Sequence, residues 1–87
     1  MYEIVISREA EKQYKKQDTK AKRRINRCID TLEKDPVSGP HIRKLHGQLE
    51  GKYRLSMGRL RIIYEVDTEK KVVRIYAIAT RGDVYKK

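Results

Sequence analysis

The hydrophobic pattern at the start of the chain predicts a short strand followed by a helix. β-Branched side chains dominate residues 2–6 and favour an extended strand. Ser7 stands where the N-cap of a helix is expected, and Glu9 and Glu11 follow in the first turn, where acidic side chains stabilise the helix dipole. This helix is predicted to run to about Lys16.

A second helix is predicted from the apolar residues that follow a break at residues 17–19. Either Asp18 or Thr19 can cap it, and it should end before Asp35-Pro36, because a residue that precedes proline avoids helical geometry. Its apolar residues recur at helical spacing and form one stripe, which comprises Ala21, Ile25, Cys28, Ile29 and Leu32. On this stripe Cys28 is expected to pack in the core rather than to act as a nucleophile.

The remainder of the chain has the pattern of a β-meander. Residues 36–51 contain both prolines and three of the five glycines, which predicts a loop with one short extended piece near residues 42–45. Three strands are then predicted at residues 52–57, 60–66 and 72–79. The expected fold is a single α+β domain over residues 1–87, with two N-terminal helices packed on one face of a mostly antiparallel four-stranded sheet in the order βααβββ.

Alternation along the strands at 52–57 and 60–66 separates an apolar side from a cationic side. The side expected to face the helices carries Tyr53, Leu55, Met57, Leu60, Ile62, Tyr64 and Val66. Lys52, Arg54 and Arg61 then gather on the opposite side, and no acid occurs between Gly51 and Tyr64. Like charges close together across strands destabilise each other, so this side is expected to bind an anion, with a solvated charged face as the alternative. With no Trp or Phe in the chain, the tyrosines before the tail are expected in the core or at its edge.

The overall charge supports a polyanionic partner. Twenty-two Lys and Arg against twelve Asp and Glu give a net charge of +10, which points to nucleic acid, a membrane surface or an acidic protein. No apolar stretch is long enough to span a bilayer, the first residues lack the features of a signal peptide, and one cysteine excludes an internal disulfide. These features predict a cytoplasmic protein that does not use a membrane. Two His and one Cys do not supply a zinc site, and no metal or other cofactor is expected.

Four segments of the chain carry a family resemblance: Lys44-Leu45-His46-Gly47, Lys52-Tyr53-Arg54-Leu55, Arg59-Leu60-Arg61-Ile62-Ile63-Tyr64 and Arg81-Gly82-Asp83-Val84-Tyr85. They resemble the RelE family of bacterial and archaeal toxins, within the RelE/ParE superfamily, and the similarity covers essentially the whole chain. The resemblance implies a RelE-like toxin of a type II toxin–antitoxin system, which enters the ribosomal A site, cleaves messenger RNA and inhibits translation. It also implies a cognate RelB-like antitoxin as partner, and binding of operator DNA by the toxin–antitoxin complex.

The resemblance further implies which residues are catalytic: Lys52, Arg54, Arg61, Arg81 and Tyr85. Arg61 would clamp the phosphate with its planar guanidinium, and Arg81 would protonate or stabilise the leaving oxygen. Tyr85 would stack on a base or orient the phosphate. Lys52 is the preferred general base, because neighbouring cations lower the pKa of a lysine.

Arg54 departs from the family pattern, since relatives often carry Lys at this position and a guanidinium does not readily lose its proton. If that position supplies the base in relatives, Lys52, His46 or a ribosomal group must do so here. Further RNA contacts through phosphates are expected at Lys20, Lys22, Arg23, Lys44 and Arg59. A solvated helix face is the alternative for the cations of the second helix.

Two other functions fit the same sequence. One is a ParE-like toxin that inhibits DNA gyrase and has no nuclease activity, since a shared fold does not fix function. The other is a catalytically inactive module that binds nucleic acid through charge alone.

Overall fold

The computed structural model describes residues 1–80 of the chain. Side-chain caps determine where its two helices begin. After strand β1 (Glu3–Ile6), the Ser7 hydroxyl accepts a hydrogen bond from the Ala10 N–H and starts α1 (Arg8–Lys15). The Asp18 carboxylate accepts from the Ala21 N–H at 2.8 Å and starts α2 (Thr19–Lys34). Asp18 is therefore the cap, and both predicted helices are confirmed.

One sheet contains all the strands, and it has five of them rather than the predicted four. The strands that follow the helices are β2 (Ile42–Lys44), β3 (Lys52–Met57), β4 (Leu60–Asp67) and β5 (Val72–Thr80). A single turn of 3₁₀ helix (Gly47–Leu49) lies between β2 and β3. The spatial order is β1-β5-β4-β3-β2, in which only β1 and β5 run parallel. The extra strand is the short extended piece predicted near residues 42–45, which pairs with the free edge of β3.

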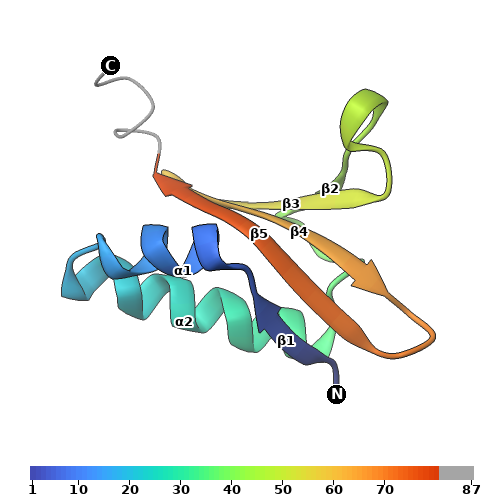
Figure 1. The fold of residues 1–87 in the computed structure, drawn as a ribbon, viewed down its shortest axis with the longest axis horizontal. Helices are drawn as coiled ribbons and strands as arrows, with labels where there is room; N and C mark the ends of the chain where they lie inside the picture. The colour runs from blue at the N-terminus through green and yellow to red at the C-terminus, as the bar shows by residue number, and fades with distance from the viewer. Residues whose placement is uncertain (81–87) are drawn as a thin grey trace.

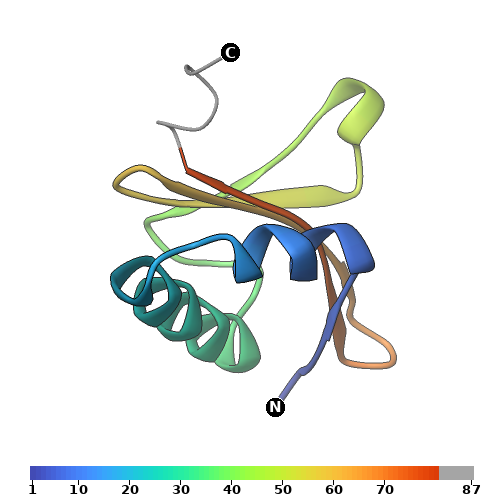
Figure 2. The same cartoon turned by 60° about the vertical axis from the view of Figure 1, so that its left-hand side comes forward.

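Both helices cover one face of this sheet and leave the other face open, as Figures 1 and 2 show from two directions. The buried core consists of Ala10, Ile25, Cys28, Leu32, Leu55, Leu60, Ile62, Tyr64, Val73, Ile75 and Ile78. These residues come from the apolar stripe of α2 and from alternate positions of β3, β4 and β5. The predicted inward-facing side of the β3–β4 hairpin is thus confirmed. In the described part of the chain, no helix is long and apolar enough to cross a bilayer.

Tyr64 anchors the loop after α2 to the sheet. Its buried hydroxyl donates a hydrogen bond to the Pro36 carbonyl at 2.6 Å, and its ring stacks on Tyr53 with centroids 5.7 Å apart. Desolvation raises the pKa of Tyr64, with smaller contributions from Tyr53 and Asp35, so the hydroxyl remains a donor. The chain between α2 and β2 is therefore fixed from inside the core.

Replacing Tyr64 with Phe tests this anchor. We expect the free energy of unfolding to fall by about 1–3 kcal/mol, because the buried Pro36 carbonyl loses its donor. Urea denaturation followed by circular dichroism measures the change. The matched control is Tyr14→Phe, whose hydroxyl donates to Asn26 at the surface and whose loss should cost less than about 0.5 kcal/mol. Equal costs for the two variants would contradict the anchoring role.

Cys28 provides a second test of the core, in which its thiol is buried as predicted. Desolvation raises the pKa of this thiol, although the charge of Arg24 opposes the shift. We expect its reaction with a disulfide reagent at pH 8 to be about a thousandfold slower in the folded protein than in urea, since the thiolate becomes accessible only on unfolding. Labelling of the folded protein at the unfolded rate would show that the thiol is exposed.

Candidate functional site

Lys52, Arg54 and Arg61 share the sheet face that points away from the helices, here called the outer face. In the register of the β3–β4 pair, Lys52 lies opposite Glu65, Arg54 opposite Ile63, and Arg61 opposite Ser56. These positions alternate with the buried residues of the same strands, and all three cations are half-buried. The prediction that the three cations share one face is confirmed.

The two arginines of the outer face differ in how their guanidinium groups are held. Arg61 Nη1 donates a 2.8 Å hydrogen bond to the Ser56 hydroxyl directly across the strand pair, which fixes the side chain. Arg54 Nε is buried and has no hydrogen-bond partner within residues 1–80. A buried donor without a partner costs free energy, and a bound oxyanion would satisfy it. Arg54 and Arg61 are therefore the candidate phosphate ligands of this face.

Arg43 belongs to the same face, although it was not among the residues predicted from the sequence. It lies on β2 directly opposite Arg54, whereas Lys44 lies opposite Tyr53 and so on the other face. Alternation along β2 could have predicted this position, because Ile42 packs against the core and the next residue, Arg43, then points to the outer face. A three-residue strand is too short for that alternation to stand out in the sequence.

The outer face also contains an acid, contrary to the expectation of an acid-free cluster. Glu65 of β4 lies opposite Lys52 of β3 on one side and opposite Arg74 of β5 on the other. Its carboxylate accepts a 2.8 Å hydrogen bond from the Tyr76 hydroxyl, and the Lys52 ammonium lies 5.0 Å from the centroid of the Tyr76 ring. The ring of Tyr76 is 37% exposed, so the expectation that it packs in the core or at its edge is wrong.

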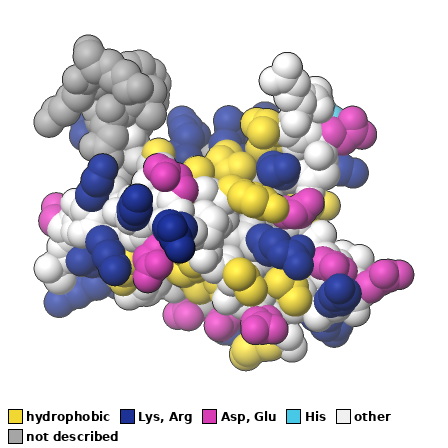
Figure 3. All heavy atoms as spheres, in the orientation of Figure 1, with side chains coloured by type: hydrophobic (Ala, Val, Ile, Leu, Met, Phe, Trp, Pro, Cys, Tyr) yellow, Lys and Arg dark blue, Asp and Glu magenta, His cyan; other side chains and the backbone are white. Residues whose placement is uncertain are grey.

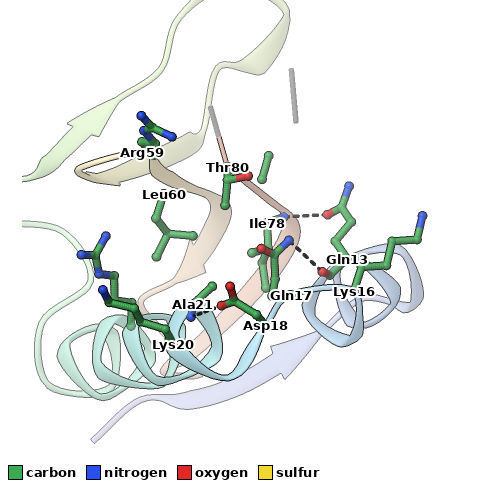
Figure 4. A pocket seen from close by; sticks show the side chains of 12 residues that line it. Gln13, Lys16, Gln17, Asp18, Lys20, Ala21, Arg59, Leu60, Ile78 and Thr80 are labelled. Carbon is green, nitrogen blue, oxygen red and sulfur yellow. Dashed lines mark hydrogen bonds between the residues drawn. The ribbon is translucent and has the colours of Figure 1, made fainter. Parts of the chain in front are cut away.

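A second cationic region is a groove of about 960 Å³ between the α1–α2 turn and the ends of β4 and β5 (Figure 4). Leu60 and Ile78 contribute its apolar wall. The cations that line it are Lys16, Lys20, Arg24 and Arg59. The acid of the groove, Asp18, is engaged as the cap of α2. This arrangement leaves the groove strongly cationic.

Of the residues predicted to contact RNA, Lys20 and Arg59 thus meet in the groove, whereas Lys22 and Arg23 lie elsewhere on α2. The ammonium of Lys22 lies over the ring of Tyr14, 5.6 Å from its centroid. The predicted RNA contacts therefore do not form one continuous surface with the outer face.

Few of these cations are neutralised. Between residues 1 and 80, the one ion pair joins Lys15 and Glu11 within α1, at 3.8 Å. Figure 3 shows Lys and Arg side chains over both the helices and the sheet, with several Asp and Glu side chains along the lower edge of that view. The net positive charge is therefore available to a polyanion.

Three further residues are candidates from the sequence, and the structure describes one of them. His46 is exposed in the loop after β2, where its backbone precedes the 3₁₀ turn and its side chain makes no capping hydrogen bond. Arg81 and Tyr85 lie outside the described residues, directly after the end of β5 at Thr80. Within the described part, no three His, Cys, Asp or Glu side chains are grouped as metal ligands.

The chain is similar to known toxins in both sequence and structure. The matching family model is described as the ParE toxin of the parDE type II toxin–antitoxin system, and it matches residues 4–85. The archaeal RelE–RelB complex from Pyrococcus horikoshii OT3 is similar in structure, with a TM-score of 0.77 at 31% identity over 93% of this chain and 96% of that one. Comparison with curated protein sequences gives no match.

Two solved structures with lower identity share the fold. The RelBE2 toxin–antitoxin complex from Mycobacterium tuberculosis has a TM-score of 0.81 at 20% identity, over 92% of this chain and 98% of that one. The YoeB/ParE toxin from Agrobacterium tumefaciens has a TM-score of 0.78 at 17% identity, over 90% of this chain and 96% of that one. These similarities confirm the predicted RelE-like α+β fold. Since the family match covers nearly the whole sequence, the chain belongs to the ParE toxin family, within the RelE/ParE superfamily of type II toxin–antitoxin toxins.

Proposed function

We propose that this toxin is a metal-independent endoribonuclease that cleaves messenger RNA in the ribosomal A site and thereby inhibits translation. The observation that carries the proposal is the pair of guanidinium groups on the outer face, one fixed by Ser56 and the other with a buried N–H that lacks a partner among residues 1–80. Such preorganised donors are suited to the charge that develops on a phosphate during cleavage. No cofactor is required.

The chemistry divides among the residues of the outer face and the C-terminal tail. Attack by the ribose 2′-oxygen on the adjacent phosphorus requires removal of the 2′-OH proton, stabilisation of a pentacoordinate phosphate, and protonation of the 5′-oxygen that leaves. Arg61 and Arg54 stabilise the phosphate, and Lys52 accepts the 2′-OH proton. The family resemblance assigns the leaving oxygen to Arg81 and the orientation of base or phosphate to Tyr85.

Cations away from the outer face hold the toxin on the ribosome. Lys20 and Arg59 in the groove, and Lys22 and Arg23 on α2, contact RNA phosphates without reading sequence. On β2, the register favours Arg43 over Lys44 as a contact to the RNA that is cleaved, because only Arg43 shares the face of Arg54.

An antitoxin restrains this activity in the cytoplasm. The related toxins from Pyrococcus horikoshii and Mycobacterium tuberculosis were solved in toxin–antitoxin complexes. We propose a RelB-like antitoxin as the partner of this chain too, and binding of operator DNA by the complex that they form.

Inhibition of DNA gyrase is the second candidate function, and the match to the ParE toxin family favours it. It gives no role to the arginines of the outer face. A module that binds nucleic acid without cleaving it is the remaining alternative, and it predicts no growth arrest on expression.

Arg61→Ala tests the nuclease directly. Because it removes a fixed donor to the phosphate, we expect codon-positioned cleavage in a translation reaction, measured by primer extension, to fall by about 10²–10³-fold. Arg81→Ala should also lose the cuts. Lys70→Ala, in the exposed β4–β5 turn, removes the same charge and should cleave like the wild type. Cleavage unchanged in both arginine variants would contradict the site, and gyrase inhibition by a wild type that cuts no RNA would establish the second candidate.

Arg43 and Lys44 provide a matched test of which face meets the RNA. The two residues are adjacent, exposed cations on opposite faces of β2. We expect Arg43→Ala to reduce the slope of log affinity for ribosomes against log salt by about 0.7, the value for one phosphate contact to single-stranded RNA. Lys44→Ala should leave the slope unchanged. The reverse result would place the RNA on the helix side of the sheet.

A further inference from the structure

Three side chains from three strands form a connected cluster at one end of the outer face. The Tyr76 ring of β5 lies under the Lys52 ammonium of β3, with 5.0 Å between nitrogen and ring centroid. The Tyr76 hydroxyl donates a 2.8 Å hydrogen bond to Glu65 Oε1 of β4. The central strand thus fixes the ring, and the ring contacts the lysine two strands away from its own.

The backbone of β5 is irregular at Tyr76. Ile63 pairs with Ala77, but the next residue, Tyr64, pairs with Ile75, so Tyr76 is the extra residue of a β-bulge. Bulges re-aim side chains and are frequent next to active sites. Ile75 remains in the core on one side of the bulge, while Tyr76 is directed onto the outer face. The bulge therefore lets Ile75 and Ile78, three positions apart, both face the core while Tyr76 lies between them on the outer face.

We propose that Tyr76 and Glu65 are positioning residues that hold Lys52 at the scissile phosphodiester of the RNA. This inference rests on the proposed nuclease function and adds two residues to its site. Tyr76 acts on the lysine through its ring, and Glu65 acts through Tyr76.

The geometry explains why an aromatic ring, rather than a carboxylate, holds the lysine. No ion pair joins Lys52 to Glu65 within residues 1–80, although the two lie opposite each other in the register. A ring face attracts the ammonium without taking up one of its hydrogens in a strong hydrogen bond. The hydrogen bond to Glu65, followed by burial and the charge of Glu65, raises the pKa of Tyr76, so its phenol remains a donor. Lys52 is thus held in place without a carboxylate paired to its ammonium, so the amine can lose a proton and then accept the one from the 2′-OH.

Single substitutions separate the ring from its hydroxyl. Tyr76→Leu removes both contacts, and we expect the maximal cleavage rate on saturating ribosomes to fall about tenfold. Loss of an exposed cation–π contact alone lowers a rate by a few-fold, and a misplacement of a catalytic group by about 1 Å can lower it by about a hundredfold. The expected factor lies between these two values. The ribosome concentration for half-maximal rate should stay within about twofold. Tyr76→Phe keeps the ring and should lose about threefold, as should Glu65→Leu.

Glu65→Gln is the conservative rescue, because its amide oxygen can still accept the hydrogen bond from the Tyr76 hydroxyl. It should cleave within about twofold of the wild type, and a loss as large as that of Glu65→Leu would overturn the positioning role. The double variant Lys52→Ala/Tyr76→Leu should cleave no more slowly than Lys52→Ala alone. Additive losses would show that Tyr76 acts independently of Lys52, which overturns the inference.

A second measurement does not depend on nuclease activity. In the wild type, the ring of Tyr76 should shift the proton resonances of the Lys52 ε-methylene group upfield, and Tyr76→Leu should abolish that shift. An unshifted wild-type resonance would overturn the inference whether or not RNA is cut. A shifted resonance in a wild type that cuts no RNA would support the contact while contradicting the proposed function, so the two failures are distinguishable.

Discussion

Burial of one face of the sheet against α2 is the constraint on which the rest of the molecule depends. Ile25 and Leu32 of the helix and Leu55 and Ile62 of the sheet are fully or almost fully buried, and each such side chain contributes about 1.5–3 kcal/mol. Side chains alternate along a strand, so burying these residues forces their sequence neighbours to the outer face. Arg54 and Arg61 are therefore brought together by the core, not by any attraction between them.

The outer face must offset the repulsion that this arrangement creates. The partners of its cations are a hydroxyl group and an aromatic ring, with one carboxylate nearby, rather than one carboxylate for each cation. Ser56 accepts from Arg61, Tyr76 lies under Lys52, and Glu65 is engaged by the Tyr76 hydroxyl. Each of these contacts is weak compared with a buried ion pair. The face therefore keeps its positive potential and its hydrogen-bond donors, to which a phosphate can bind.

The sequence was sufficient to predict features that depend on local periodicity. The helix cap at Ser7, the strand at residues 52–57 and the shared face of its cations follow from spacing alone, whereas the second cap was narrowed only to Asp18 or Thr19. Features that depend on pairing between distant segments could not be predicted from the sequence. Glu65 meets Lys52 only through the β3–β4 register, and the bulge on β5 lets both Ile75 and Ile78 face the core, which simple alternation along the strand does not give. Arg81 and Tyr85 rest on family resemblance, because no periodic element surrounds them.

Fold membership leaves the activity of this toxin to be decided by its outer face. Helices and core are what the superfamily shares, and they are equally compatible with a nuclease and with an inhibitor of gyrase. A surface that only binds a protein partner has no need of a buried Arg54 Nε–H that lacks an acceptor in the described part of the chain, since such a group costs stability in the free toxin. Nor does it need a tyrosine ring held beneath a lysine by a carboxylate on the strand between them. Both features prepare cations at one place on the molecule, as the proposed binding of a reacting phosphate requires.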